Sequence, residues 1–204
     1  MNAPRLSALA AETTALQAAL TTRWHEEPAA AAADASDLLR LVRENHRRNF
    51  DLWHCEDEAR RDDLGPEHVS RMKRAIDQFN QERNDCIQRL DEWLVVHLAP
   101  PDAGCPLNSE TPGMMIDRLS ILALKLYHMD IEARRADATT EHREKARGKI
   151  AVLARQREDL QHCLEELIDD VVARRRTFRV YFQFKMYNDR ALNPALYRQA
   201  EPTR

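Results

Sequence analysis

Charged and amide side chains, together with one tryptophan, recur on three consecutive predicted helices, among residues that would otherwise form an apolar interior. They are Asn49, Trp53, Glu56, Asp57 and Arg60 on one helix, Asp77, Asn80, Arg83 and Asn84 on the next, and Asp117, Arg118, Lys125 and His128 on a third. Guanidinium and ammonium groups bind phosphates, and amides hydrogen-bond sugars, bases and carboxylates. The set therefore predicts a polar pocket between helices that binds a phosphorylated or sugar-containing small molecule.

The first of these helices carries a mixed strip of apolar and polar side chains. At 100° per residue, His46, Asn49, Trp53, Glu56 and Arg60 fall within a wedge roughly 80° wide. A purely structural helix would place only apolar residues on its inward face. The pattern therefore indicates that this helix brings polar groups into the interior.

Arg83 interrupts the apolar stripe of the next helix, so its charge needs a partner. A guanidinium on an apolar face is stabilised by a carboxylate that accepts its parallel N–H groups. Glu56, Asp57 and Asp117 are the candidates for that carboxylate. The sequence does not choose among them.

The same residues allow two interpretations, which the sequence leaves open. They could be a buried ion-pair network that fixes the register of the helices. They could instead line a ligand pocket, where Glu56, Asp57 and Asp77 would hold a divalent cation such as Mg²⁺ through carboxylate oxygens. The amides of Asn80 and Asn84 favour the pocket. Whether the protein is an enzyme is not decided by the sequence.

Other chemistries have weaker support. The pairs Asp51-x-x-His54 and Asp159-x-x-His162 have the acid-x-x-His spacing of di-iron bundles, but Asp51 and His162 lie opposite the apolar stripes of their helices. The four cysteines match no zinc-binding spacing. No serine or cysteine has the surroundings of a nucleophile elbow.

Five helices are predicted to position these residues. They cover about residues 5–23, 36–64, 66–98, 111–129 and 139–182, and residues 25–35 and 99–106 are connections. Thr111 is expected to cap the fourth helix, with Pro112 at its first position. Apolar residues lie on almost every side of that helix, so we expect it to be surrounded by the others.

The predicted fold is all-α, an antiparallel bundle of about five long helices with a folded-back C-terminal segment. Residues 1–35 would form an N-terminal helix and linker, residues 36–194 the helical bundle domain, and residues 195–204 a tail. The stretch Phe184–Pro194 is rich in aromatic and polar side chains, and we expect it to pack on the bundle.

Composition limits the partners of the chain. Its 31 basic and 34 acidic residues are interspersed and give a net charge of −3, unlike the excess positive charge of nucleic-acid-binding proteins. No apolar run reaches the roughly 18 residues of a membrane span. No secretory signal is visible, so we expect a cytoplasmic location.

Four motifs in order carry a family resemblance. They are Asn49-x-x-Leu52-Trp53-x-x-Glu56-Asp57-x-Ala59-Arg60, Ile76-Asp77-x-x-Asn80-Gln81-x-Arg83-Asn84-Asp85, Glu110-Thr111-Pro112-Gly113 with Asp117-Arg118-Leu119-Ser120-Ile121-Leu122, and Phe184-Lys185-Met186-Tyr187-Asn188-Asp189 with Leu192-Asn193-Pro194. Over about residues 36–194 the chain resembles an uncharacterised bacterial domain-of-unknown-function family. The resemblance implies that the gene for this protein lies near genes for glycosyltransferases of cell-surface polysaccharide assembly. It does not imply a reaction that the protein catalyses.

Two function hypotheses follow from the residues and the resemblance together. In the first, a cytoplasmic helical protein binds a phosphorylated or sugar-containing molecule during surface-glycan biosynthesis. In the second, a non-enzymatic interaction or scaffold protein docks a glycosyltransferase or self-associates as a homodimer. A ligand-dependent rise in thermal stability would favour the first hypothesis.

Overall fold

The computed structural model describes residues 8–27, 36–182, 184 and 191–194. The chain forms five long helices, α1 (Leu9–Glu26), α2 (Asp37–Glu58), α3 (Pro66–Leu98), α4 (Pro112–Arg134) and α5 (Thr140–Val172), with a short 3₁₀ helix η2 (Asp62–Leu64) between α2 and α3. No β-strand occurs in these described ranges, apart from one isolated bridge between Leu107 and Thr177. The predicted all-α fold is confirmed.

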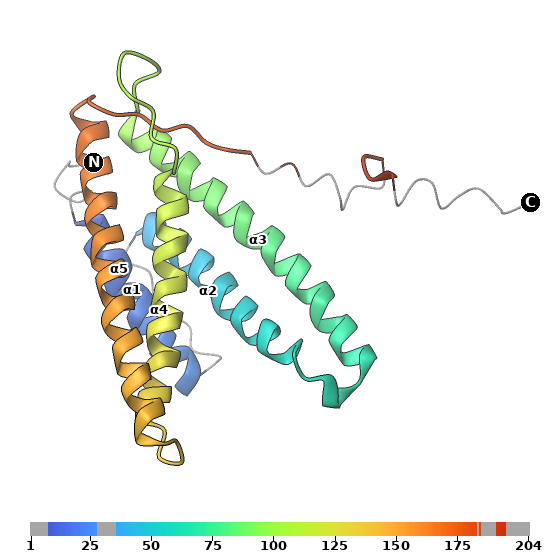
Figure 1. The fold of residues 1–204 in the computed structure, drawn as a ribbon. Coiled ribbons are helices and arrows are strands. Elements are labelled where there is room, and N and C mark those ends of the chain that lie inside the picture. The colour runs from blue at the N-terminus through green and yellow to red at the C-terminus, as the bar shows by residue number, and fades with distance from the viewer. Residues whose placement is uncertain (1–7, 28–35, 183, 185–190, 195–204) are drawn as a thin grey trace, which may run out of the picture.

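Helix α4 occupies the centre of the arrangement, as its sequence predicted. It contacts each of the other four long helices. Helix α5 runs back alongside α4, while α2 and α3 form a second antiparallel pair that diverges from the first (Figure 1). Helix α1 packs against α2, α4 and α5. The interior side chains of α4 can therefore meet groups from every neighbouring helix.

Capping side chains begin three of the helices, among them the predicted cap Thr111. Ser36 caps α2, Thr111 caps α4 and Thr139 caps α5, each through a side-chain oxygen that accepts a backbone N–H from the first turn. These bonds satisfy amide groups that have no partner within the helix. Pro112 occupies the first turn of α4, where its missing N–H costs nothing.

Two helices end earlier than predicted. Helix α2 ends at Glu58, and η2 fills the space before Gly65. Helix α5 ends at Val172 rather than near residue 182, because Arg174 adopts a left-handed φ of 57° that no α-helix continues. Phe178 is nevertheless only 2% exposed, since an extended segment rather than the helix carries it into the core.

The segment after α5 is anchored by Thr177. Its hydroxyl donates to the carbonyl of Pro101 at 2.6 Å, and its backbone pairs with the loop before α4. Beyond it, Phe182 is 57% exposed and Phe184 is 85% exposed. Most of the predicted folded-back stretch Phe184–Pro194 lies outside the described residues.

Two apolar clusters hold the bundle together. The larger combines leucines and isoleucines from all five helices with Phe178. The smaller contains Leu20, Trp24, Phe50 and Leu124 and lies where α1, α2 and α4 meet. None of the described helices has the length and apolar character needed to cross a membrane.

Candidate functional site

Asp117 is the centre of a buried polar network between α2, α3 and α4. The carboxylate is 2% exposed. Its Oδ1 accepts hydrogen bonds from the side-chain amides of Asn45 at 3.0 Å and Asn49 at 2.9 Å. The Arg83 guanidinium donates from Nε to Oδ1 at 2.8 Å and from Nη2 to Oδ2 at 2.5 Å. Four hydrogen bonds therefore compensate for the burial of this charge.

Arg83 thus has the carboxylate partner that its position on an apolar stripe required. Of the three predicted candidates, the partner is Asp117. The hydrogen bonds that Arg83 donates to Asp117 raise the pKa of Arg83, while partial burial opposes this rise. Because the guanidinium is held by two parallel bonds, its orientation at the protein surface is fixed.

The network continues to α1 through a fully buried histidine. His46 Nδ1 lies 2.7 Å from the Ser120 hydroxyl, and its Nε2 lies 2.9 Å from the Thr21 hydroxyl. Burial lowers the pKa of His46 to about 3. His46 and Ser120 are both 0% exposed. This pair is sealed from solvent, so it has the role of a structural hydrogen bond.

Asn49 and Arg83, which both bind Asp117, also line a cavity of about 340 Å³ between α2, α3 and α4, which we name the Arg83 pocket. Seven of the predicted site residues line it: Asn49, Trp53, Glu56, Asp57, Arg60, Asn80 and Arg83. Arg60 pairs with Glu56 at 3.1 Å, and Arg83 pairs with Asp117. The cations of the pocket therefore already have partners, and its remaining polar groups are carboxylates and amides.

A larger groove of about 720 Å³, which Trp53 also borders, lies between α4 and α5, and we name it the lysine groove. Its walls are formed by Trp53 of α2, Lys125, His128, Met129 and Glu132 of α4, and Lys145, Gly148, Lys149, Val152, Leu153 and Gln156 of α5. None of its three lysines forms an ion pair with any residue in the described ranges. Glu132 is bound to Arg135 and His142 instead.

Three predicted site residues lie elsewhere. Asp77 is exposed and does not line the Arg83 pocket, and neither does Asn84. Arg118 forms an exposed ion pair with Glu110 at 2.7 Å and borders a separate groove. Glu56, Asp57 and Asp77 do not converge on one point, so the structure gives no support for Mg²⁺ held by all three carboxylates.

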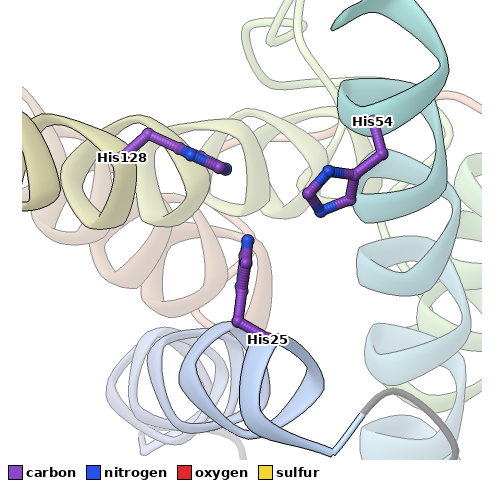
Figure 2. A group of neighbouring side chains, drawn as sticks. All are labelled: His25, His54 and His128. Atoms are coloured by element: carbon purple, nitrogen blue, oxygen red, sulfur yellow. The ribbon is translucent and has the colours of Figure 1, made fainter. Parts of the chain in front are cut away.

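Helices α1, α2 and α4 bring together three histidines, His25, His54 and His128, as Figure 2 shows. One ring nitrogen from each lies within 4.8 Å of the others. The pKa of His128 is lowered to about 4, and that of His54 is lowered as well. Burial is the main cause for both, and the neighbouring histidines add to it. Both rings are therefore neutral near pH 7.

Aromatic rings enclose these histidines. Tyr127 stacks on His25 at 4.1 Å, and Trp53 stacks on His128 at 4.5 Å with only 7° between the ring planes. Phe50 meets His54 edge-on at 4.5 Å. The rings are thereby held in place on several sides. Trp53 links this cluster to both cavities, because it lines each of them.

Sequence reasoning missed His25 and His54 as members of one cluster. The sequence pattern places His25 in the connection after the first helix, whereas α1 continues to Glu26. The spacing of His54 pairs it with Asp51, which instead binds Arg47 and Arg48. The one signal in the sequence was that His54 follows the apolar Phe50 by one helical turn.

Comparison with known proteins identifies a match to one protein family. A family model described as a protein of unknown function matches residues 39–180. No curated protein and no solved structure matches the chain. Function therefore has to be argued from the groups on this chain.

Proposed function

This chain belongs to the DUF4254 family of proteins of unknown function, and we propose that it binds a small phosphorylated molecule in the lysine groove beside Trp53. The observation that carries the proposal is that Lys125, Lys145 and Lys149 all border this groove without an acidic partner among the described residues. Most arginines with described side chains are paired. Unpaired ammonium groups that share one concave surface attract an anion.

The walls of the groove suit the organic part of such a ligand. Its volume of about 720 Å³ lies within the usual range of small-molecule sites, roughly 300–1,000 Å³. Met129, Val152 and Leu153 supply apolar surface, and Trp53 supplies an aromatic ring. A phosphate at the lysines would leave the rest of the ligand against these side chains.

The Arg83 pocket supports a sugar as that organic part. Asn49 and Asn80 carry amides, and Glu56 and Asp57 carry carboxylates, and all of these groups hydrogen-bond hydroxyls. Because Trp53 borders both cavities, a sugar phosphate or nucleotide sugar is the ligand class that would use both. We propose that this binding serves surface-glycan synthesis, on the basis of the gene neighbourhood that the family resemblance implies, and that it takes place in the cytoplasm.

Calorimetric titration with sugar phosphates, nucleotide sugars and inorganic phosphate, with and without Mg²⁺, tests the proposal. We expect Lys145→Gln and Lys149→Gln each to weaken binding about tenfold, which corresponds to about 1.4 kcal/mol. Arg147→Gln is the matched control, because Arg147 lies between these lysines on α5, is exposed, and does not line the groove. The proposal fails if no ligand binds, or if the control weakens binding as much as the lysine variants.

A further inference from the structure

We propose that His25, His54 and His128 form a binding site for one divalent transition-metal ion, with Zn²⁺ as the best fit. The three imidazoles come from α1, α2 and α4 and turn their nitrogens toward a common point (Figure 2). In a tetrahedral zinc site with Zn–N bonds of 2.0–2.1 Å, ligand nitrogens lie roughly 3.4 Å apart. The nitrogens here lie within 4.8 Å of one another. Side-chain rotations that move each nitrogen by about 1 Å would bring them to the distances of a zinc site.

The backbone selects which nitrogen of His25 points at the common centre. His25 Nδ1 lies 2.7 Å from the carbonyl oxygen of Thr21. A carbonyl only accepts hydrogen bonds, so Nδ1 carries the hydrogen and Nε2 carries the free lone pair. A histidine that donates its second ring N–H to a backbone carbonyl is the usual arrangement of a metal ligand, because that bond fixes both tautomer and ring orientation.

Two nitrogens of the cluster are buried without the hydrogen bond that burial normally requires. His25 Nε2 and His128 Nε2 are inaccessible to solvent and have no hydrogen-bond partner among the described residues. Buried polar atoms that lack a partner are rare, and an ion is one of the few groups that account for them. Both atoms belong to the same cluster of three, so one ion would satisfy them together.

The ligand set identifies the class of metal. Within the described residues, the cluster contains imidazole nitrogens and no carboxylate, so it does not suit Mg²⁺ or Ca²⁺, which take oxygen ligands. Imidazole suits zinc, copper, nickel and iron. Three histidines leave a fourth tetrahedral position for water, as in zinc sites with three protein ligands. This inference is argued from different observations than the lysine groove, although His128 also borders that groove.

Metal titration of the tag-free full-length chain, after a chelator has removed bound metal, tests this site. We expect one Zn²⁺ per chain, and a Co²⁺ complex with the visible absorption of tetrahedral cobalt. His54→Gln should weaken Zn²⁺ binding by more than the 10- to 100-fold that loss of an outer-shell group costs. His162→Gln is the matched control, because His162 is 69% exposed and pairs with Glu166.

The design separates loss of the site from loss of the fold. Circular dichroism and the thermal midpoint in chelator should be similar for His54→Gln, His162→Gln and the unaltered chain. If His54→Gln does not fold, the unaltered chain still decides the matter through its stoichiometry and cobalt spectrum. Absence of Zn²⁺ binding at micromolar concentration, or equal binding by His54→Gln and the unaltered chain, would overturn the proposal.

Discussion

Arg83 of α3 and Asp117 of α4 are joined by two parallel hydrogen bonds, one to each carboxylate oxygen. The carboxylate side is buried, whereas the Arg83 side chain is 26% exposed and forms part of a pocket wall. The pair therefore connects the interior of the bundle to its surface. The pair has features of both interpretations of the sequence, the buried ion-pair network and the ligand pocket. Asp117 is buried within the bundle, and Arg83 faces a cavity.

Removing the buried charge should be strongly destabilising. Asp117→Asn would leave the Arg83 guanidinium without its carboxylate and would replace the acceptor shared by Asn45 and Asn49. Breaking a buried pair typically costs about 3–5 kcal/mol, and we expect a loss near the lower end because Arg83 is partly exposed. Urea unfolding monitored by circular dichroism measures this free energy.

The matched control for that measurement is an exposed ion pair between α4 and the loop that precedes it. Arg118 pairs with Glu110 at 2.7 Å, and their side chains are 55% and 41% exposed. Glu110→Gln should therefore change the free energy of unfolding by less than about 1 kcal/mol. A loss for Asp117→Asn that is no larger than the control would contradict the assigned role of Asp117.

Gly113 should not tolerate a methyl group. A Cβ there would lie 2.6 Å from Asp91 Oδ1 and 2.8 Å from the carbonyl oxygen of Ile87, both on α3. We expect Gly113→Ala to lower the free energy of unfolding by about 1–3 kcal/mol through overpacking. Gly148→Ala is the control, because no atom lies within 4 Å of its added Cβ, and it should raise stability by about 0.5–1 kcal/mol. Thermal denaturation of both variants gives the comparison.

Acid should destabilise the protein partly through His46. Its pKa is about 3 in the folded chain, against the ordinary value of 6.5 that an exposed histidine has once the chain unfolds. Below pH 6.5 the unfolded chain binds a proton that the folded chain does not, so this stability is complete above pH 6.5 and is lost as pH falls toward 3. Between pH 7 and pH 5 the loss from this one histidine is about 2 kcal/mol.

His46→Gln isolates that contribution, because glutamine can still hydrogen-bond Thr21 and Ser120. Urea unfolding at pH 7 and pH 5 should show a smaller loss of stability for the variant, by about 2 kcal/mol. His54 and His128 titrate in both proteins and cancel in the comparison. An unchanged pH dependence would mean that His46 is not the group responsible.

Ala99 is a site where glycine should stabilise. It ends α3 in the left-handed conformation, with φ 46° and ψ 60°, which costs a residue with a Cβ about 1–2 kcal/mol. Glycine would remove this cost, but its greater entropy in the unfolded chain offsets part of the benefit. We therefore expect Ala99→Gly to raise the free energy of unfolding by about 0.5–1 kcal/mol. Ala173→Gly, at the end of α5 with φ −80°, should instead lower stability. Calorimetric melting of the two variants distinguishes them.

Local chemistry made the start of three of the five long helices predictable. Ser36, Thr111 and Thr139 are capping residues, and each accepts a bond from its own first turn. The end of α5 was not predictable in this way, because the apolar spacing continues to Phe178. That spacing is satisfied by an extended segment anchored at Thr177, and only the tertiary contact with Pro101 reveals it.

The candidate site was predictable to the level of the helix face. The inward strip of α2 and the need of Arg83 for a carboxylate follow from residue spacing. The choice of Asp117 over Glu56 as the partner of Arg83 depends on how far α3 lies from α4 and from α2. The residue spacing along a single helix carries no information on those distances. The histidine cluster was out of reach for the same reason, since its members lie on three different helices with no shared motif.

The position of His25 near the end of α1 has a consequence for how the chain is held together. Helix α1 precedes the region that matches the family model, whereas His54 and His128 lie within it. A metal ion bound by all three histidines would cross-link α1 to α2 and α4. Release of the ion would then loosen the N-terminal helix first, and relatives that lack an equivalent of His25 would have to hold that helix by apolar contacts and by hydrogen bonds such as those of Gln17 and Thr21.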